Sequence, residues 1–182
     1  MVTSKEEILA ASREILQRDG WKGLNIRAVA SSCGISIGSV YNYYSDKREL
    51  EEATVESIWY DIFHPENGIT PNTPLLEYVE WLYKRMNYGS EKYPGFFSLH
   101  SVSLMNMDIR RSKNKMVKSW SHMQSSLSRI MEADKSISPD VFTENFTRDV
   151  FAHTILSLLI AAMLEEEYDP DPTIEIIKRV LF

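Results

Sequence analysis

The sequence predicts an all-α protein of about nine helices, in which a three-helix helix-turn-helix domain precedes a larger helical domain. Three observations lead to this fold class. Apolar residues recur at helical spacing along most of the chain, convincing strand alternation is absent, and Gly and Pro residues separate the periodic segments. A chain of 182 residues is also long enough to bury a hydrophobic core. We expect the domains to comprise residues 1–50 and 51–182.

The most informative stretch is residues 25–50, where two short helices are predicted on either side of a tight turn. Apolar side chains of residues 26–33 share one helical face, and Gly34 follows at a position where helices commonly end in a left-handed conformation. Ser36 can cap a second helix over residues 37–44, which consists mostly of small, amide and phenolic residues. Such residues allow close approach and can hydrogen-bond to phosphates or base edges. This helix is therefore predicted to face a polar partner.

Before this motif, a capping box at Thr3 or Ser4 predicts a first helix that ends at Gly20. After it, the helical pattern continues in segments that are separated by Pro and Gly residues. These segments are expected at residues 46–63, 74–88, 96–105, 107–133, 138–165 and 173–181.

The last two predicted helices are apolar on more than one side, and a domain of this size has limited core in which to bury both. We therefore expect a homodimer interface on these helices. A purely intramolecular core is the alternative. The residues expected at the interface are Phe151, Ile155, Leu158, Leu159, Ala162 and Ile177.

The net charge of −6 is unevenly distributed. Residues 1–50 carry seven Lys and Arg against six Asp and Glu, whereas residues 51–182 carry thirteen against twenty. The acidic part is thus excluded as a nucleic-acid surface, and the charge of the first part is only a weak indication of one. A single cysteine, no metal-ligand spacing, no signal peptide and no membrane-length apolar run lead us to expect a cytoplasmic protein without metal, cofactor or membrane partner.

Residues 34–38 read G-I-S-I-G and match the G-x-S-x-G pattern of the nucleophile elbow in α/β-hydrolases. That elbow requires a strand before the serine and a helix after it. Because the preceding residues are helical by period, we expect no hydrolase and no enzyme.

The pattern of the first third of the chain resembles the DNA-binding signature of the TetR family of transcriptional regulators. It comprises G-W at residues 20–21 and I-R-x-V-A-x-x-C-G-I-S-x-G-x-x-Y-x-Y-Y-x-x-K-x-x-L at residues 26–50. Mild departures are Tyr44, where the family usually has Phe, and Cys33, where Ala is common. By position, the resemblance implies that five side chains bind DNA phosphates or lie close to them: Arg27, Ser39, Tyr41, Tyr43 and Lys47. It implies base contacts for Ser36, Ile37, Gly38 and Asn42.

The same resemblance implies a homodimer that binds a palindromic operator in double-stranded DNA, and a C-terminal domain that binds a ligand. We expect a repressor that a small hydrophobic effector releases. An activator with the same DNA-binding mode is one alternative, and a helical small-molecule-binding protein with a vestigial helix-turn-helix is another. The aromatic and methionine side chains of the middle segment suit an adaptable apolar pocket, although most of them also suit a core. The expected pocket residues are Trp59, Phe63, Trp81, Phe96, Met105, Trp120 and Met123.

Overall fold

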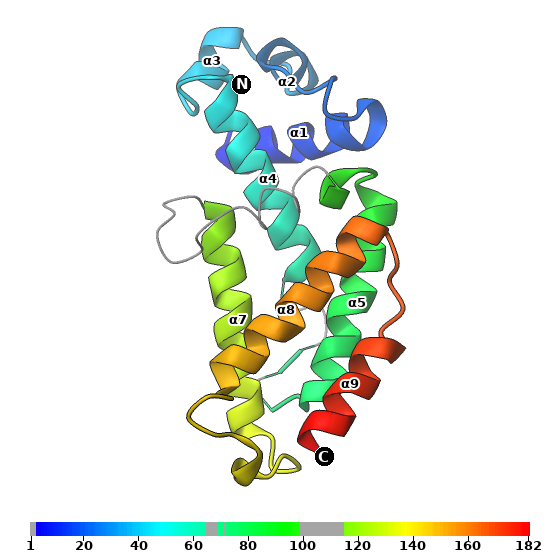
Figure 1. The fold of residues 1–182 in the computed structure, drawn as a ribbon. Helices are drawn as coiled ribbons and strands as arrows, with labels where there is room; N and C mark the ends of the chain where they lie inside the picture. The colour runs from blue at the N-terminus through cyan, green and yellow to red at the C-terminus, as the bar shows by residue number, and fades with distance from the viewer. Residues whose placement is uncertain (1–2, 65–68, 71, 99–114) are drawn as a thin grey trace. The chain divides into compact units, whose positions relative to one another are not determined.

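The computed structural model describes residues 3–64, 69–70, 72–98 and 115–182, with the side chains of residues 115–119 left out. Every regular element in these ranges is a helix, which confirms the all-α fold class there (Figure 1). The elements are α1 (Lys5–Asp19), α2 (Ile26–Ser32), α3 (Ile37–Tyr41), α4 (Lys47–Phe63), α5 (Leu75–Lys92), α7 (Lys115–Ala133), the 3-10 helix η2 (Pro139–Val141), α8 (Arg148–Glu165) and α9 (Asp171–Leu181).

The chain divides into two compact units. The first comprises Met1–Ile62 together with Lys92–Pro94, and the second comprises Phe63–Glu91 together with Gly95–Phe182. Most of α4 therefore lies in the first unit, beyond the boundary expected after residue 50. The buried side of α4 and a hydrogen bond from Arg13 of α1 to the Ser57 hydroxyl account for this placement. The boundary between separately functioning domains stays a prediction.

Local sequence signals determine the helix ends of the first unit. Ser4 caps α1 by accepting from the Glu7 N–H at 3.1 Å, and the Glu7 carboxylate accepts from the Ser4 N–H at 2.8 Å. Asn25 caps α2 through the Ala28 N–H at 3.0 Å. Gly34 adopts a φ of 64°, which a side chain would strain, and so turns the chain from α2 towards α3. The core of this unit includes Ile8, Ile15, Leu24, Val29, Val40 and Leu50.

In the second unit, α8 packs against α7 (Figure 1). A hydrogen bond of 2.6 Å between the hydroxyl groups of Tyr83 and Thr173 connects α5 to α9. At the end of α7, the Asp134 carboxylate accepts from the Leu75 N–H at 2.9 Å and so caps α5. Helices far apart in sequence are thus joined by polar contacts as well as by apolar burial.

The helix predicted from residue 138 begins ten residues later, at Arg148. Ser138 caps only the short helix η2, after which Phe142 is extended. Thr147 then caps α8 by accepting from the Val150 N–H at 3.2 Å. The prediction was wrong because the Ser-Pro start signal opens a single turn, and a second cap nearer the apolar run starts the long helix.

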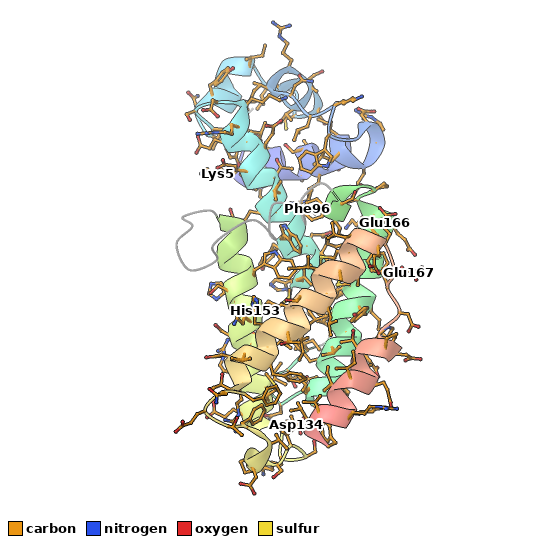
Figure 2. All side chains as sticks on the ribbon, in the orientation of Figure 1. Lys5, Phe96, Asp134, His153, Glu166 and Glu167 are labelled. Carbon is orange, nitrogen blue, oxygen red and sulfur yellow. The ribbon has the colours of Figure 1, made fainter. Side chains whose placement is uncertain are left out.

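Helix α8 ends at a left-handed residue that is not glycine. Glu166, which Figure 2 labels next to Glu167, has φ 56° and ψ 30°. The N–H groups of both residues donate to the Ala162 carbonyl. This arrangement satisfies a carbonyl of the last turn and turns the chain away from the helix axis. Glu165 is thus the last residue of α8, and Glu166 and Glu167 follow the helix instead of extending it.

The side chains predicted for the dimer interface mostly fill the core of a single chain. Phe151, Ile155, Leu159, Ala162 and Ile177 are each at most 8% exposed, and Leu158 is half-buried. A side chain without accessible surface packs within its own chain, which was the alternative interpretation for these five residues. The apolar side chains that α8, α9 and the C-terminal residue turn outward are Val150, Ile176, Val180 and Phe182, with exposed fractions of 39–57%.

Candidate nucleic-acid interface

The short helix α3 is anchored on one side and exposed on the other. Its N-cap Ser36 accepts from the Ser39 N–H at 3.0 Å, and the two hydroxyl groups lie 2.8 Å apart. Val40 has no exposed surface, and Tyr44 beyond the helix is 3% exposed. The helix predicted over residues 37–44 ends earlier, at Tyr41, although the Tyr44 N–H still donates to the Val40 carbonyl at 3.1 Å. Two buried side chains thus hold α3 on the first unit.

The opposite side of α3 carries the residues predicted to contact bases. Ser36, Gly38 and Asn42 are exposed, as are Ile37 at 43% and Tyr41 at 50%. These side chains present a mixture of hydrogen-bonding groups and apolar surface. That mixture suits the major groove, where amide and hydroxyl groups read base edges and apolar groups contact thymine methyls.

Gly38 is a small residue that the fold itself does not require. A Cβ placed there would meet only the Ser36 Oγ within 4 Å, at an ordinary contact distance of 3.7 Å. Its φ is not in the left-handed region, unlike that of Gly34. Glycine inside a helix destabilises it by about 1 kcal/mol relative to alanine. A glycine at this exposed position is therefore best explained by a surface that must come close to the α3 backbone.

Tyr43 is bound within the first unit. Its hydroxyl donates to the backbone carbonyl of Thr3, immediately before α1, and the residue is half-buried. The phenolic hydrogen is thus not available to a phosphate in this conformation. Tyr43 instead ties the end of the α3 segment to the start of α1, a role for which the sequence carries no signal.

The segment around α3 carries positive charge and no acidic residues. No Asp or Glu occurs from residue 20 to residue 45, and Arg27 is exposed at the start of α2. The Lys47 ammonium lies 3.1 Å from a Glu51 carboxylate oxygen, and the two side chains are 56% and 35% exposed. Exposed pairs within one helix contribute only a few tenths of a kcal/mol, so Lys47 can exchange this partner for a phosphate at little cost.

Lys5 is a further cation that the sequence analysis did not single out. Its ammonium lies 5.5 Å from the centroid of the Tyr44 ring. Burial raises the pKa of the Tyr44 phenol, with a smaller contribution from nearby glutamates, so this ring stays neutral. Lys5 thus lies near the ring of Tyr44, the residue that stands where the TetR family usually has Phe.

The residues predicted to bind an effector only partly come together. In the second unit, the ring of Phe63 lies 6.4 Å from Trp81 and 6.5 Å from Phe97, and Phe96 lies 5.5 Å from Phe97. Tyr78 stacks on Trp81 at 5.7 Å. We call these five residues the aromatic cluster; its members Phe97 and Tyr78 are not among the expected pocket residues.

The other four predicted pocket residues have different positions. Trp59 is buried in the first unit, and Trp120 and Met123 lie on α7, buried and half-buried respectively. Met105 lies outside the described residues. The burial of Phe96 and Trp120 also fits a core function for these two side chains.

The described residues also bear on three other features: a metal site, a membrane span and a hydrolase nucleophile elbow. Among these residues, no group of three or more His, Cys, Asp or Glu residues is placed to hold a metal ion. Within the same residues no helix is both long and apolar enough to cross a membrane. The G-x-S-x-G pattern begins in the turn between α2 and α3 and extends into α3, so a helix precedes its serine where a nucleophile elbow has a strand.

Comparison with known proteins agrees with this description. Residues 8–54 match the family described as bacterial regulatory proteins, tetR family. A curated relative, an uncharacterized HTH-type transcriptional regulator in the lacX 3′ region of Lactococcus lactis subsp. lactis, is 28% identical over 99 residues. That match covers 47% of this chain and 50% of the relative, so the chain spans about half the length of the curated protein it matches.

Solved structures share the fold at low sequence identity. The regulator SCO7222, a TetR from Streptomyces coelicolor, has a TM-score of 0.65 at 16% identity, over 93% of this chain and 72% of that one. BioQ of Mycobacterium smegmatis has a TM-score of 0.61 at 16% identity, over 98% and 96% of the two chains. BioQ with its natural double-stranded DNA operator has a TM-score of 0.62 at 17% identity, over 91% and 88%.

Helix α3 has one buried and one exposed side and packs in the same unit as α1 and α2. This arrangement is that of a helix-turn-helix protein. The family match covers this same unit and extends into α4. The helix-turn-helix unit of this chain is therefore similar to that of the tetR family of bacterial regulatory proteins.

Proposed function

We propose that the chain is a ligand-responsive transcriptional regulator that binds a specific DNA sequence. The observation that carries this proposal is the exposed side of α3, where Gly38 leaves the backbone accessible beside Ser36 and Asn42. A surface of this composition, free of acidic residues from residue 20 to residue 45, fits a polyanion with a readable groove.

In this proposal α3 enters the major groove. Asn42 would read adenine through its amide, and Ile37 would contact a thymine methyl. Arg27 and Lys47 would bind phosphates on either side and so fix the register of the helix. Because sequence readout by one five-residue helix is short, a second copy is needed to lengthen the site.

A homodimer would supply that second copy. The outward apolar side chains of α8 and α9, Val150, Ile176 and Val180, are candidates for its interface because each is at least 39% exposed. Two-fold symmetry then calls for a palindromic operator, with half-sites about 34–36 Å or a multiple of that distance apart. BioQ, which shares the fold, has been solved with its own double-stranded DNA operator. Double-stranded DNA is therefore the first partner to test for this chain.

A small hydrophobic effector is the ligand that we propose for the aromatic cluster. Its rings offer apolar and π surface, which favours neutral or cationic aromatic molecules over anions. An effector releases DNA only if it binds the DNA-free state more tightly. A nearly complete switch needs about 5 kcal/mol of such preference.

The experiment that tests DNA binding is a genomic pull-down with the purified full-length chain. We expect the recovered fragments to share a palindrome, and a transcription assay on the recovered promoter then separates repressor from activator. Recovery of random fragments only would contradict the proposal and favour the alternative, a small-molecule-binding protein with a vestigial helix-turn-helix.

The effector class is tested with tryptophan fluorescence against lipophilic cations, neutral aromatics and carboxylates. Each compound that quenches is then assayed for release of the recovered operator. Neutral or cationic compounds are expected to release DNA. Release by carboxylates alone would contradict the assignment of an apolar site.

A further inference from the structure

A polar cluster outside the proposed DNA and effector surfaces joins the last turn of α4 to the end of α5. The Lys92 ammonium lies 2.9 Å from Oδ2 of Asp61, and the Tyr93 hydroxyl donates to the same oxygen at 3.0 Å. The Asp61 and Lys92 side chains are 30% and 34% exposed, and Tyr93 is 3% exposed. We call these three residues the Asp61 cluster. Two donors thus converge on one half-buried carboxylate oxygen.

The charges around the cluster favour the ionised carboxylate. Burial raises the pKa of the Asp61 carboxyl, but the hydrogen bonds from Lys92 and Tyr93 and the charges of Lys92 and Arg13 outweigh burial, so the pKa lies below its ordinary value. Burial, together with the neighbouring Asp61 charge, raises the pKa of Tyr93 to about 12. Asp61 is therefore an anion and Tyr93 a neutral donor at neutral pH.

The cluster extends to α1 through Arg13. This guanidinium donates to the Ser57 hydroxyl, one turn before Asp61 on α4, and lies 3.1 Å from a Glu6 carboxylate oxygen. Its positive charge lowers the pKa values of both Asp61 and Tyr93, which places it near the cluster. Helices α1 and α4 and the end of α5 are thus connected by one set of charged and polar side chains.

At the end of α5 the chain passes from the second unit into the first and then returns. Helix α5 belongs to the second unit as far as Glu91, whereas Lys92–Pro94 belong to the first unit, and the chain returns to the second unit at Gly95. The segment that Asp61 holds is therefore the end of a helix whose remaining length carries Tyr78 and Trp81 of the aromatic cluster.

We propose that Asp61 is a positioning residue that couples the second unit to the DNA-binding unit by holding Lys92 and Tyr93 on α4. This inference rests on the proposed function, because it names the contact through which an event at α5 would reach α4, α1 and α3. Isolated exposed ion pairs contribute little. The Asp61 cluster differs because two donors share one carboxylate oxygen and one of them, Tyr93, is almost fully buried.

The coupling can be measured without knowing the effector, because coupling between two sites is reciprocal. If α5 influences DNA binding, DNA binding must influence α5. The probe is a DNA duplex that covers the region upstream of the chain's own gene, and the readout is amide hydrogen exchange of the full-length chain with and without this duplex. For the wild type we expect slower exchange in α3 and also, by about fivefold or more, in α5.

Asp61→Ala is expected to retain the DNA-induced protection of α3 and to lose that of α5. Tyr93→Phe removes one donor, conserves the ring and is expected to reduce the protection of α5 in the same direction. Glu80→Gln is the matched control, because Glu80 lies 3.9 Å from Lys84 in an exposed pair on α5 itself. This control should behave as the wild type does.

Unchanged protection of α5 in both Asp61→Ala and Tyr93→Phe would overturn the inference, as would a wild type in which DNA protects α3 but not α5. In either case the proposed DNA binding would stand, because α3 is still protected. If the duplex protects no part of the wild type, and the genomic pull-down also recovers no common site, the proposed function and the inference both fail.

Discussion

The hydroxyl groups of Tyr83 and Thr173 lie 2.6 Å apart in the interior of the second unit, where they connect α5 to α9. Tyr83 is 3% exposed and Thr173 is 4% exposed, so water does not readily replace either partner. Ninety residues separate the two in sequence, and no local pattern predicts the pair. Such a buried contact is expensive to break on one side only, because the remaining hydroxyl is left without its partner and without water.

Tyr83→Phe is therefore expected to lower the free energy of unfolding by about 1–3 kcal/mol. Adding Thr173→Val should recover much of that stability, since both polar groups are then removed. Urea denaturation measures both changes. Tyr41→Phe, at a phenol that is 50% exposed, is the control and should have little effect. Thr173→Val alone completes the cycle, and single effects that simply add in the double variant would show that the pair is not coupled.

Gly38→Ala is expected to leave the fold intact, or to stabilise it by up to about 1 kcal/mol, because the added Cβ meets only the Ser36 Oγ. The same change should weaken DNA binding, since the methyl group would hold the α3 backbone away from the groove. Thermal unfolding and a DNA-binding titration measure the two effects. Gly34→Ala is the contrasting variant, because its φ of 64° predicts reduced stability. Full DNA binding by Gly38→Ala would mean that α3 does not approach DNA at this residue.

Lys47→Ala should weaken binding to operator and to random duplex by similar factors, as expected when a phosphate-binding cation is removed. It should also lower the slope of log affinity against log salt by about one unit for each phosphate that Lys47 neutralises. Lys84→Ala, which removes a 75% exposed lysine from α5, is the matched control. A weakening confined to the operator would show that Lys47 reads sequence instead.

Ile176→Asp is expected to yield a folded monomer, because Ile176 is 43% exposed on a single chain and the new charge would be buried only in a dimer. Phe151→Asp should unfold the chain instead, since Phe151 is 3% exposed within it. Sedimentation velocity and circular dichroism together distinguish the two results. A dimer that persists in Ile176→Asp would place the interface elsewhere. A folded monomer from Phe151→Asp would return that residue to the interface.

Burial raises the pKa of Tyr78 to about 12, against smaller opposing contributions from Arg129 and Ser126. The unfolded chain loses this proton near pH 10, so between about pH 10 and 12 the folded chain binds more protons and stability falls as pH rises. Tyr78→Phe should make the decline of the urea midpoint over this range less steep. An identical decline in the variant would mean that Tyr78 ionises at its ordinary pH.

The helix ends of the first unit could be read from the sequence because short-range contacts determine them. Ser4 with Glu7, Asn25 and Gly34 each act on a backbone group within a few residues, so the capping rules suffice. The start of α8 could not be read in this way. Ser138 and Thr147 both cap a helix, and the ring of Phe146 contacts Phe142 before α8 and Phe151 within it, which are contacts that the capping rules do not consider.

The surface of α3 was also predictable, since its outward residues follow from composition and helical period. The role of Tyr43 was not, because its hydroxyl bonds to Thr3, forty residues away in sequence. The same limit applies to the aromatic cluster: residue type and helical period indicated that Phe63, Trp81 and Phe96 are apolar, but they did not identify Phe97 as the common neighbour of Phe63 and Phe96.

The sequence by itself determined the all-α class, the helix-turn-helix unit and the exposed residues of its second helix, because periodicity, caps and turn glycines act over a few residues. Only the tertiary structure decided which apolar faces meet. Periodicity identifies Phe151 and Ile155 as buried but is silent on whether the same chain or a second copy covers them, and the fold covers them within one chain. Likewise, Asp61 and Lys92 are ordinary surface charges in sequence, and they meet because the packing of α4 and the end of α5 brings them within 2.9 Å.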